Sequence, residues 1–246
     1  MRVSLTGSGD LSGEYQKINP LANSYSFRSL SDGEIGQILS NTDVLIHNSA
    51  GLKDYNSSSN IILTRRIVRL ASKYKPKIRF INIGSMSFLN ESGYLPIEKM
   101  TPYAYSKYIS EAYCFAKLSN ITSIRFSTLF YRNPKKDILS KLINDAVFKR
   151  EIILINEGKS KRDFLPINKA VEEIHKIINQ TDVTTTIASG VETTFLQIAL
   201  IIQKFTDCRI EFIDGTESLV LSTFANKIGV NLEKEIGDYI KYLKFL

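Results

Sequence analysis

Tryptophan is absent from the 246-residue sequence, and cysteine and histidine occur only twice each. Cys114 and Cys208 lie inside apolar segments, at a spacing that fits neither a disulfide framework nor a zinc site. His47 and His175 are distant in sequence from each other and from both cysteines, so we predict no catalytic metal. Long apolar runs are also lacking, since a run such as Ile198–Ile202 is far too short to cross a bilayer.

The start of the chain leaves no room for the charged and apolar regions of a signal peptide, because a glycine-rich turn begins at Gly7. We therefore expect a soluble, cytoplasmic protein. The formal net charge is +7, but Lys and Arg are scattered among Asp and Glu along the predicted helices. This pattern favours a solvated, lysine-rich surface, and we expect neither a nucleic acid nor a membrane as a partner.

With 43% hydrophobic and 23% charged residues, the chain has a globular composition and can bury a large core. Short β-branched or apolar segments alternate with amphipathic helical patterns, as in βαβ units around a parallel sheet. We predict an α/β fold, a Rossmann-like doubly wound parallel sheet with a small C-terminal substrate-binding lobe. Residues 1–131 would form mainly the nucleotide-binding domain and residues 132–246 mainly the lobe, interwoven with the first.

The expected strands are Arg2–Leu5, Tyr25–Arg28, Val44–His47, Ile78–Ile83, Ser123–Phe126, Ile152–Ile155, Thr185–Ala188 and Arg209–Phe212. The expected helices are Gly33–Leu39, Ser58–Lys73, Tyr103–Leu118, Asp137–Lys149, Lys169–Asn179 and Thr194–Phe205. The first six strands are spaced as in a nucleotide-binding sheet, in which ligand sites lie at the carboxyl ends of the strands.

A turn with three glycines, Thr6-Gly7-Ser8-Gly9-Asp10-Leu11-Ser12-Gly13, follows the first expected strand. Such a turn brings backbone N–H groups against a pyrophosphate if a helix begins there. Polar turns with glycine are common after strands, so this turn alone does not identify a function.

Motifs along nearly the whole chain resemble those of the extended short-chain dehydrogenases/reductases, the group of NDP-sugar epimerases, dehydratases and reductases. A Tyr-x-x-x-Lys match alone arises by chance about once in a chain this rich in Tyr and Lys, so the order of all the motifs carries the resemblance. The segments similar to family motifs are the glycine turn, Val44-Leu-Ile-His47-Asn-Ser-Ala50, Asn60-Ile-Ile-Leu-Thr64, Ile83-Gly-Ser85, Pro102-Tyr103-Ala-Tyr-Ser106-Lys107, Arg125-Phe-Ser-Thr-Leu-Phe-Tyr131 and Arg162-Asp163-Phe164-Leu-Pro-Ile167.

The resemblance implies an NAD(P)-binding Rossmann domain with Ser85, Tyr103 and Lys107 as catalytic residues. Tyr103 and Lys107 are one helical turn apart, so the ammonium can stabilise a phenolate and lower a tyrosine pKa that is ordinarily about 10. Tyr103 would then act as an acid or base near neutral pH, while the Ser85 hydroxyl polarises the reacting carbonyl or alcohol.

The same resemblance implies the binding residues. Ser85 and Arg162 would contact the substrate, with the Arg162 guanidinium on the diphosphate of a nucleotide sugar. We interpret His47 as a hydrogen-bonded core residue and Asn60 as a residue that fixes the local backbone. The expected cofactor-binding residues are Gly7, Ser8, Gly9, Asp10, Leu11, Arg28, Asn48, Ser49, Ala50, Tyr103 and Lys107.

The sequence departs from the family pattern in four places. Asp10 stands where the central glycine of the turn belongs, and its carboxylate would repel a pyrophosphate unless it points away. Asn19-Pro20 leaves room only for a short or distorted first helix. Arg28-Ser29 replaces the acidic residue typical of NAD enzymes, which favours NADP over NAD. Met86-Ser87 replaces the Asp-Glu pair of the dehydratases, which disfavours dehydration.

Three functions stay open. We expect first an NADPH-dependent reductase of a keto-sugar nucleotide, second an NDP-sugar 4-epimerase, and third a non-catalytic binding or scaffold protein that kept the fold. Family members commonly dimerise through two helices, and we expect a homodimer. The apolar residues expected at its interface are Tyr108, Ile109, Tyr113 and Phe115 on one helix and Ile67, Leu70 and Tyr74 on the other.

Overall fold

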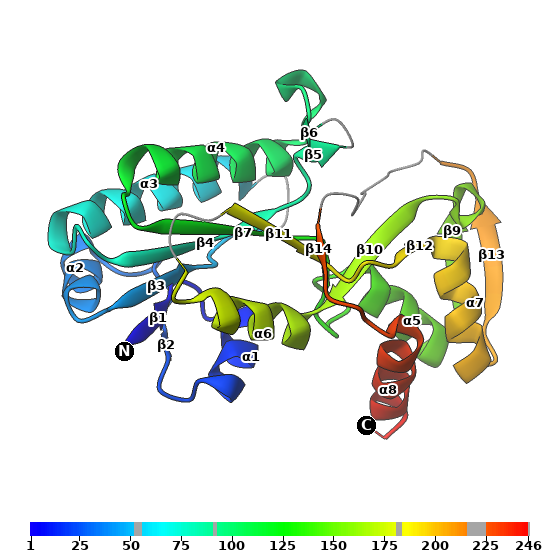
Figure 1. Ribbon diagram of the computed structural model, residues 1–246. Coiled ribbons are helices and arrows are strands. Elements are labelled where there is room, and N and C mark those ends of the chain that lie inside the picture. The colour runs from blue at the N-terminus through cyan, green and yellow to red at the C-terminus, as the bar shows by residue number, and fades with distance from the viewer. Residues whose placement is uncertain (52–55, 91–92, 181–183, 216–224, 246) are drawn as a thin grey trace. The chain divides into compact units, whose positions relative to one another are not determined.

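Figure 1 shows a computed structural model with an α/β fold, which describes residues 1–51, 56–90, 93–180, 184–215 and 225–245. Its contacts divide the chain into two units. The first comprises Met1–Phe126 and Asn168–Thr186, and the second comprises Ser127–Ile167 and Ile187–Leu246. The first unit therefore includes a segment, Asn168–Thr186, that the sequence placed in the C-terminal lobe.

Within the described residues, the main sheet has seven strands in the order β14-β11-β7-β4-β3-β1-β2. The chain runs from β1 to one side for β2 and then to the other side for β3, and both partners pair with β1 in parallel. This reversal of strand order makes the carboxyl ends of β1 and β3 the topological switch point, where open α/β sheets bind ligands. The strands are β1 (Val3–Leu5), β2 (Asn23–Ser24), β3 (Val44–His47), β4 (Arg79–Ser85), β7 (Ile121–Phe126), β11 (Thr184–Ala188) and β14 (Asn226–Lys227).

Helices cover both faces of the strands of the first unit. Figure 1 shows α3 and α4 on one face and α1 and α6 on the other. Buried apolar residues of the first face, including Ile67, Leu45 and Phe80, form one core with α2 and α3. The helices are α1 (Asp10–Ile18), α2 (Asp32–Ser40), α3 (Ser57–Tyr74), α4 (Pro102–Lys117) and α6 (Ile167–Ile177).

The second strand was predicted wrongly. It is Asn23–Ser24, and the predicted range Tyr25–Arg28 runs into a turn instead. Phe27 turns inward and is fully buried, and the Arg66 guanidinium donates to the carbonyls of Phe27 and Leu30. These long-range contacts satisfy backbone groups that a strand would pair with a neighbour.

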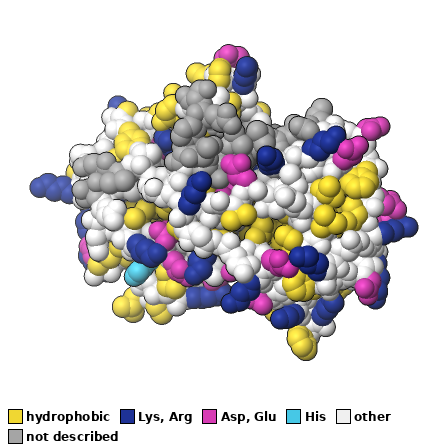
Figure 2. Space-filling model, turned by 45° about the vertical axis from the view of Figure 1, so that its right-hand side comes forward, with side chains coloured by type: hydrophobic (Ala, Val, Ile, Leu, Met, Phe, Trp, Pro, Cys, Tyr) yellow, Lys and Arg dark blue, Asp and Glu magenta, His cyan; other side chains and the backbone are white. Residues whose placement is uncertain are grey.

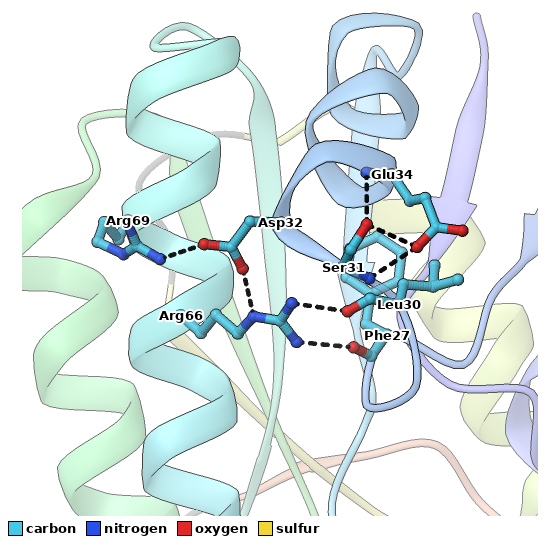
Figure 3. A network of polar contacts seen from close by, with 7 residues as sticks. All are labelled: Phe27, Leu30, Ser31, Asp32, Glu34, Arg66 and Arg69. Atoms are coloured by element: carbon cyan, nitrogen blue, oxygen red, sulfur yellow. Dashed lines mark hydrogen bonds and ion pairs between the residues drawn. The ribbon is translucent and has the colours of Figure 1, made fainter.

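Figure 3 shows the polar network that holds this turn. Asp32 accepts from Arg66 Nε and Arg69 Nη2, each at 2.6 Å. Ser31 and Glu34 form a capping box at the start of α2. The network fixes the backbone on both sides of Arg28.

The first helix, α1, is short, as predicted: it has nine residues and ends before Asn19 and Pro20. Of the three apolar residues predicted for a dimer interface on α3, Ile67 and Leu70 are buried instead, whereas Tyr74 is 38% exposed. Ile67 and Leu70 belong to the core at 0% and 1% exposure. The Tyr74 ring packs on α2, where a Cβ added at Gly36 would lie 2.6 Å from it.

The second unit has its own core around Phe130, Ile143, Phe164, Ile198 and Ile236. Its strands are β8 (Thr128–Phe130), β10 (Lys161–Pro166) and β12 (Glu192–Thr194) in one sheet and β9 (Glu151–Ile155) and β13 (Arg209–Ile213) in another. Its helices are α5 (Ile138–Phe148), α7 (Phe195–Phe205) and α8 (Leu232–Lys244).

The predicted strand Ile152–Ile155 is therefore not part of the nucleotide-binding sheet. It pairs in parallel with β13, within the second unit. Three short elements complete the first unit, namely the hairpin of β5 (Leu89–Asn90) and β6 (Gly93–Tyr94) and the 3-10 helix η2 (Ile97–Lys99). A further 3-10 helix, η3 (Asn156–Gly158), follows β9.

Among the helices described, none combines the length and the apolar character that a membrane span requires. The described ranges also hold no group of three or more His, Cys, Asp or Glu side chains placed to bind a metal ion.

Candidate active site

Helix α4 presents Tyr103 and Lys107 one turn apart. Its start is fixed by Thr101, whose hydroxyl accepts a hydrogen bond from Ala104 N at 3.2 Å, and by Pro102 at the first helical position. A proline there loses no hydrogen bond, because the first N–H groups of a helix have no helical partner. The cap and the proline thus place Tyr103 in the first turn.

The structure brings Tyr103 and Ser85 together, with Ser85 as the last residue of β4. A hydrogen bond joins the two side chains. Ser85 Oγ also donates to Ser87 Oγ at 3.0 Å and accepts from Ser87 N at 3.1 Å, which fixes the serine hydroxyl at the strand end. A sugar carbinol or carbonyl placed there would meet both hydroxyl groups.

The expected lowering of the Tyr103 pKa is not found. Burial raises the pKa of Tyr103 to about 12, and the hydrogen bond with Ser85 opposes this only in part. The Lys107 ammonium donates instead to the carbonyl of Ile83, two residues before Ser85. Burial also lowers the pKa of Lys107 to about 8, while the negative charge of the nearby Glu111 acts in the opposite direction.

The glycine turn lies at the switch point between β1 and β3. Gly7 N donates to Asn48 Oδ1 at 3.0 Å, and Asn48 Nδ2 donates to Ser12 Oγ at 2.8 Å. The Thr6 hydroxyl accepts from the backbone N–H groups of Asn48 and Ser49 at 3.2 and 3.3 Å. The predicted cofactor residues of the two strand ends therefore form one connected group, and Ala50 follows them directly in the chain.

Helix α1 begins at Asp10 with Gly9 as its N-cap residue and without a side-chain capping bond. Ser8 and Gly9 are exposed, while Leu11 is buried in the core. An N-terminus with this geometry binds anions through its backbone N–H groups. The Asp10 carboxylate lies in the same first turn. There it interacts favourably with the helix dipole, but it would repel the negative charge of a bound anion.

Asn60 fixes the backbone near the switch point, as interpreted from the sequence. Its amide group exchanges two hydrogen bonds with Gly51, at 2.8 and 3.0 Å. Its Oδ1 also accepts from Arg28 Nη2 at 2.8 Å, so the guanidinium of Arg28 is held on α3.

His47 is a buried core residue that links β1, β3 and α3. Its ring nitrogens contact the hydroxyls of Thr6 and Thr64, each at 2.9 Å. Burial, together with the positive charges of Lys107 and Arg28, lowers the pKa of His47 to about 3. The ring is neutral at physiological pH.

Arg162 lies in the second unit, on β10. Its guanidinium stacks 5.9 Å from the centre of the Phe195 ring and donates to the Lys161 carbonyl at 2.9 Å. The neighbouring Asp163 is fully buried and accepts from Ser127 Oγ at 2.7 Å and from the N–H groups of Ser189 and Gly190 at 2.9 Å. Asp163 thus anchors the strand that carries Arg162.

Sequence reasoning missed Glu111, which is buried beside Lys107 and lies one helical turn further along α4. Its signal in the sequence is the spacing of four residues from Lys107, which puts both side chains on one helix face.

The chain belongs to the NAD dependent epimerase/dehydratase family, whose model matches residues 31–187. The match begins after the glycine turn. Over 218 residues the chain is 25% identical to a protein of Methanocaldococcus jannaschii named "Putative UDP-glucose 4-epimerase", covering 78% of this chain and 70% of that protein.

Two solved structures have a similar fold. The UDP-glucose 4-epimerase of Thermotoga maritima with UDP-glucose gives a TM-score of 0.82 at 15% identity, covering 100% of this chain and 99% of that one. The dTDP-glucose 4,6-dehydratase of Bacillus anthracis with NAD gives 0.79 at 14% identity, covering 99% and 96%. These likenesses confirm the predicted Rossmann-like fold, and the family match confirms the resemblance read from the motifs.

Proposed function

We propose that the protein is an NAD-dependent enzyme that acts on a nucleotide-activated sugar as a 4-epimerase. The observation that carries this proposal is the hydrogen-bonded pair of Ser85 and Tyr103, with Lys107 one turn further along α4, in a chain of the epimerase/dehydratase family. The named relatives include 4-epimerases, which is why we place epimerisation before the keto-sugar reduction expected from the sequence.

We propose NAD as the cofactor. The uncapped start of α1 and the exposed Ser8 and Gly9 suit a pyrophosphate. Hydrogen bonds from Gly7 to Asn48 and from Ser49 to Thr6 connect the adjacent ends of β1 and β3. Tyr103 and Lys107 would lie at the nicotinamide end, where the cofactor supplies hydride transfer. Arg28 is bound to Asn60, which weakens its case as a ligand of a 2′-phosphate, and the dehydratase of similar fold was solved with NAD.

A titration with NADH and NADPH tests the choice of cofactor. We expect tighter binding of NADH, and we expect Arg28→Glu to leave NADH binding unchanged, because this side chain is engaged by Asn60. Tighter binding of NADPH that Arg28→Glu weakens would restore the NADP expectation drawn from the sequence.

In the proposed reaction, Tyr103 takes the proton of the sugar hydroxyl and returns it, and Ser85 hydrogen-bonds the same oxygen. Because burial raises the pKa of Tyr103 to about 12, its phenol is protonated at neutral pH. We therefore expect the oxidative half of the reaction to accelerate as the pH rises. Arg162 would bind the diphosphate of the substrate.

Keto-sugar reduction is the second candidate, favoured by the same protonated phenol, which is the form that donates a proton. Dehydration is disfavoured because the buried Met86 stands next to Ser85, where a dehydratase needs an acidic group.

The test is incubation with NAD and UDP-glucose, with the product sugar identified by proton NMR. We expect formation of the 4-epimer, and we expect Tyr103→Phe to lower the rate by about 10²- to 10⁴-fold, the range for losing a general acid or base. Tyr105→Phe is the matched control, because Tyr105 lies on the same helix and is 38% exposed.

Each other outcome has a defined meaning. Oxidation of NADH by a 4-keto sugar nucleotide, without epimerisation, would favour the reductase. An unchanged rate in Tyr103→Phe would refute the assigned role of Tyr103. A protein that binds neither NADH nor NADPH would favour the scaffold alternative.

We further propose a homodimer through α3 and α4. These helices expose Ile62, Tyr105 and Phe115 at 66%, 38% and 40%, together with the expected Tyr74 at 38%, whereas the expected Ile67 and Leu70 are buried. Sedimentation velocity should show a dimer that Phe115→Glu dissociates; a monomeric wild type would contradict the proposal.

A further inference from the structure

A buried ion pair lies behind the proposed catalytic groups. Glu111 on α4 and Arg125 on β7 are 4% and 8% exposed. Arg125 Nε donates to Glu111 Oε1 at 3.0 Å, and its Nη2 donates to the same oxygen. The second oxygen, Oε2, accepts from Ser123 Oγ at 2.6 Å. Both oxygens of the Glu111 carboxylate therefore accept hydrogen bonds from β7.

This pair packs directly against Gly84 of β4. A Cβ added at Gly84 would lie 3.0 Å from Glu111 Oε2 and 3.1 Å from Arg125 Cγ. Gly84 stands between Ile83, whose carbonyl accepts from Lys107, and Ser85, which bonds Tyr103. The ion pair thus packs against Gly84, the one residue between the Ile83 carbonyl that binds Lys107 and the Ser85 hydroxyl that binds Tyr103.

Arg125 also holds the chain that follows Ser85. Its Nη2 donates to Tyr94 Oη at 2.7 Å, and its guanidinium lies 5.2 and 5.3 Å from the ring centres of Phe88 and Tyr94. The guanidinium therefore connects α4, through Glu111, with the residues that follow Ser85 in the chain.

Stability alone does not account for such a pair. The free energy needed to remove two charges from water is about as large as the free energy gained from their attraction. Buried ion pairs therefore contribute little net stability compared with apolar side chains of similar volume. Its hydrogen bonds to β7 and its contact with Gly84 instead specify one position of the strand end.

We propose that Glu111 and Arg125 are positioning residues for the proposed reaction, which fix the spacing of the Ile83 carbonyl and the Ser85 hydroxyl through Gly84 and keep a negative charge one helical turn from Lys107. The inference rests on the proposed function for its effect on turnover. It adds two residues that act through Ser85 and Lys107 without touching the substrate.

Among the residues that the structure describes, Glu111 supplies Lys107 with negative charge at neutral pH. On α4, Tyr103 and Cys114 have pKa values raised by burial to about 12 and are neutral at physiological pH. On β3, His47 is neutral because its pKa is about 3. On β7, Arg125 is positive and bound to Glu111. Loss of the Glu111 charge should therefore let Lys107 lose its proton at lower pH.

The test compares Glu111→Gln with Ser123→Ala, which removes a hydrogen bond from the same carboxylate but keeps its charge. The titration of Lys107 is followed by NMR of labelled lysine side chains, with Lys107→Arg for assignment. We expect the midpoint, about 8 in the wild type, to fall by about one pH unit in Glu111→Gln and to stay in place in Ser123→Ala. The alkaline limb of kcat/KM should move with the midpoint.

An unchanged midpoint in Glu111→Gln, or a loss of activity equal at all pH values, would overturn the proposal. Should Glu111→Gln fail to fold, Glu111→Asp keeps the charge but shortens its reach toward Gly84. We expect it to lower kcat while leaving the midpoint and the Kd for NADH near the wild-type values, and an unchanged kcat would overturn the proposal. The NMR titration needs no substrate, so a protein inactive on nucleotide sugars would refute the proposed function and leave this test intact.

Discussion

Replacing Gly84 by alanine tests the packing at the proposed active site. The added Cβ would meet Glu111 Oε2 at 3.0 Å, Arg125 Cγ at 3.1 Å and the Ile124 carbonyl oxygen at 3.2 Å. The last atom belongs to the backbone of the adjacent strand β7, and the first two belong to a buried, hydrogen-bonded ion pair, so moving any of them costs free energy. Overpacking of this kind costs about 1–3 kcal/mol.

The assay is thermal unfolding followed by circular dichroism, combined with kcat. Each kcal/mol should lower Tm by about 2–4 °C in a protein of this size. We also expect a lower kcat, because Ser85 follows Gly84 directly.

Gly13→Ala is the matched control, because Gly13 lies in α1 and a Cβ there meets nothing within 4 Å. Alanine is favoured over glycine in a helix by about 0.5–1 kcal/mol, so this variant should keep or raise Tm. A Gly84→Ala protein as stable and as active as Gly13→Ala would refute the account of how β4, Glu111 and Arg125 pack.

Two further predictions concern buried ionisable groups. Burial holds the pKa of His47 at about 3, below its ordinary value of about 6.5, so the unfolded chain takes up the proton first as the pH falls. Stability should therefore drop between these pH values, and His47→Gln should show a smaller drop in urea unfolding; equal pH dependence would contradict this. Asp163→Ala should cost about 1–3 kcal/mol for each buried donor left unpaired, at Ser189 N and Gly190 N, while Asp163→Asn retains an acceptor. Equal urea midpoints for the two variants would argue against it.

Local signals predicted most elements of the fold. Helix α4 was placed to within a residue at each end, because a proline and the apolar spacing mark it in the sequence. The prediction of the second strand was wrong because Phe27 turns into the core and Arg66, on a helix distant in sequence, binds carbonyl groups of the turn. Ile152–Ile155 was predicted correctly as a strand, but its partner β13 is far along the chain. The alternation of apolar and polar residues in a strand does not identify the strand with which it pairs.

In the candidate site, the sequence predicted that Ser85 and Tyr103 lie together, while their roles stay a prediction. The family resemblance implied that Ser85 and Tyr103 act on the same group, and the structure joins their side chains by a hydrogen bond. The direction of the Tyr103 pKa shift could not be predicted, because it depends on burial and on the orientation of the Lys107 ammonium toward Ile83. Helical spacing alone does not reveal either property.

The most direct test of the central claim is to mix the protein and NAD with UDP-glucose and to follow the fluorescence of reduced nicotinamide. Because an epimerase takes a hydride from the sugar and returns it, the fluorescence should rise only by the small share of bound cofactor that is reduced during turnover, while the 4-epimer accumulates. Tyr103→Phe should abolish both signals and Tyr105→Phe should keep both. A protein that binds both NAD and UDP-glucose, yet shows no reduced nicotinamide and no new sugar at any pH, would contradict the claim.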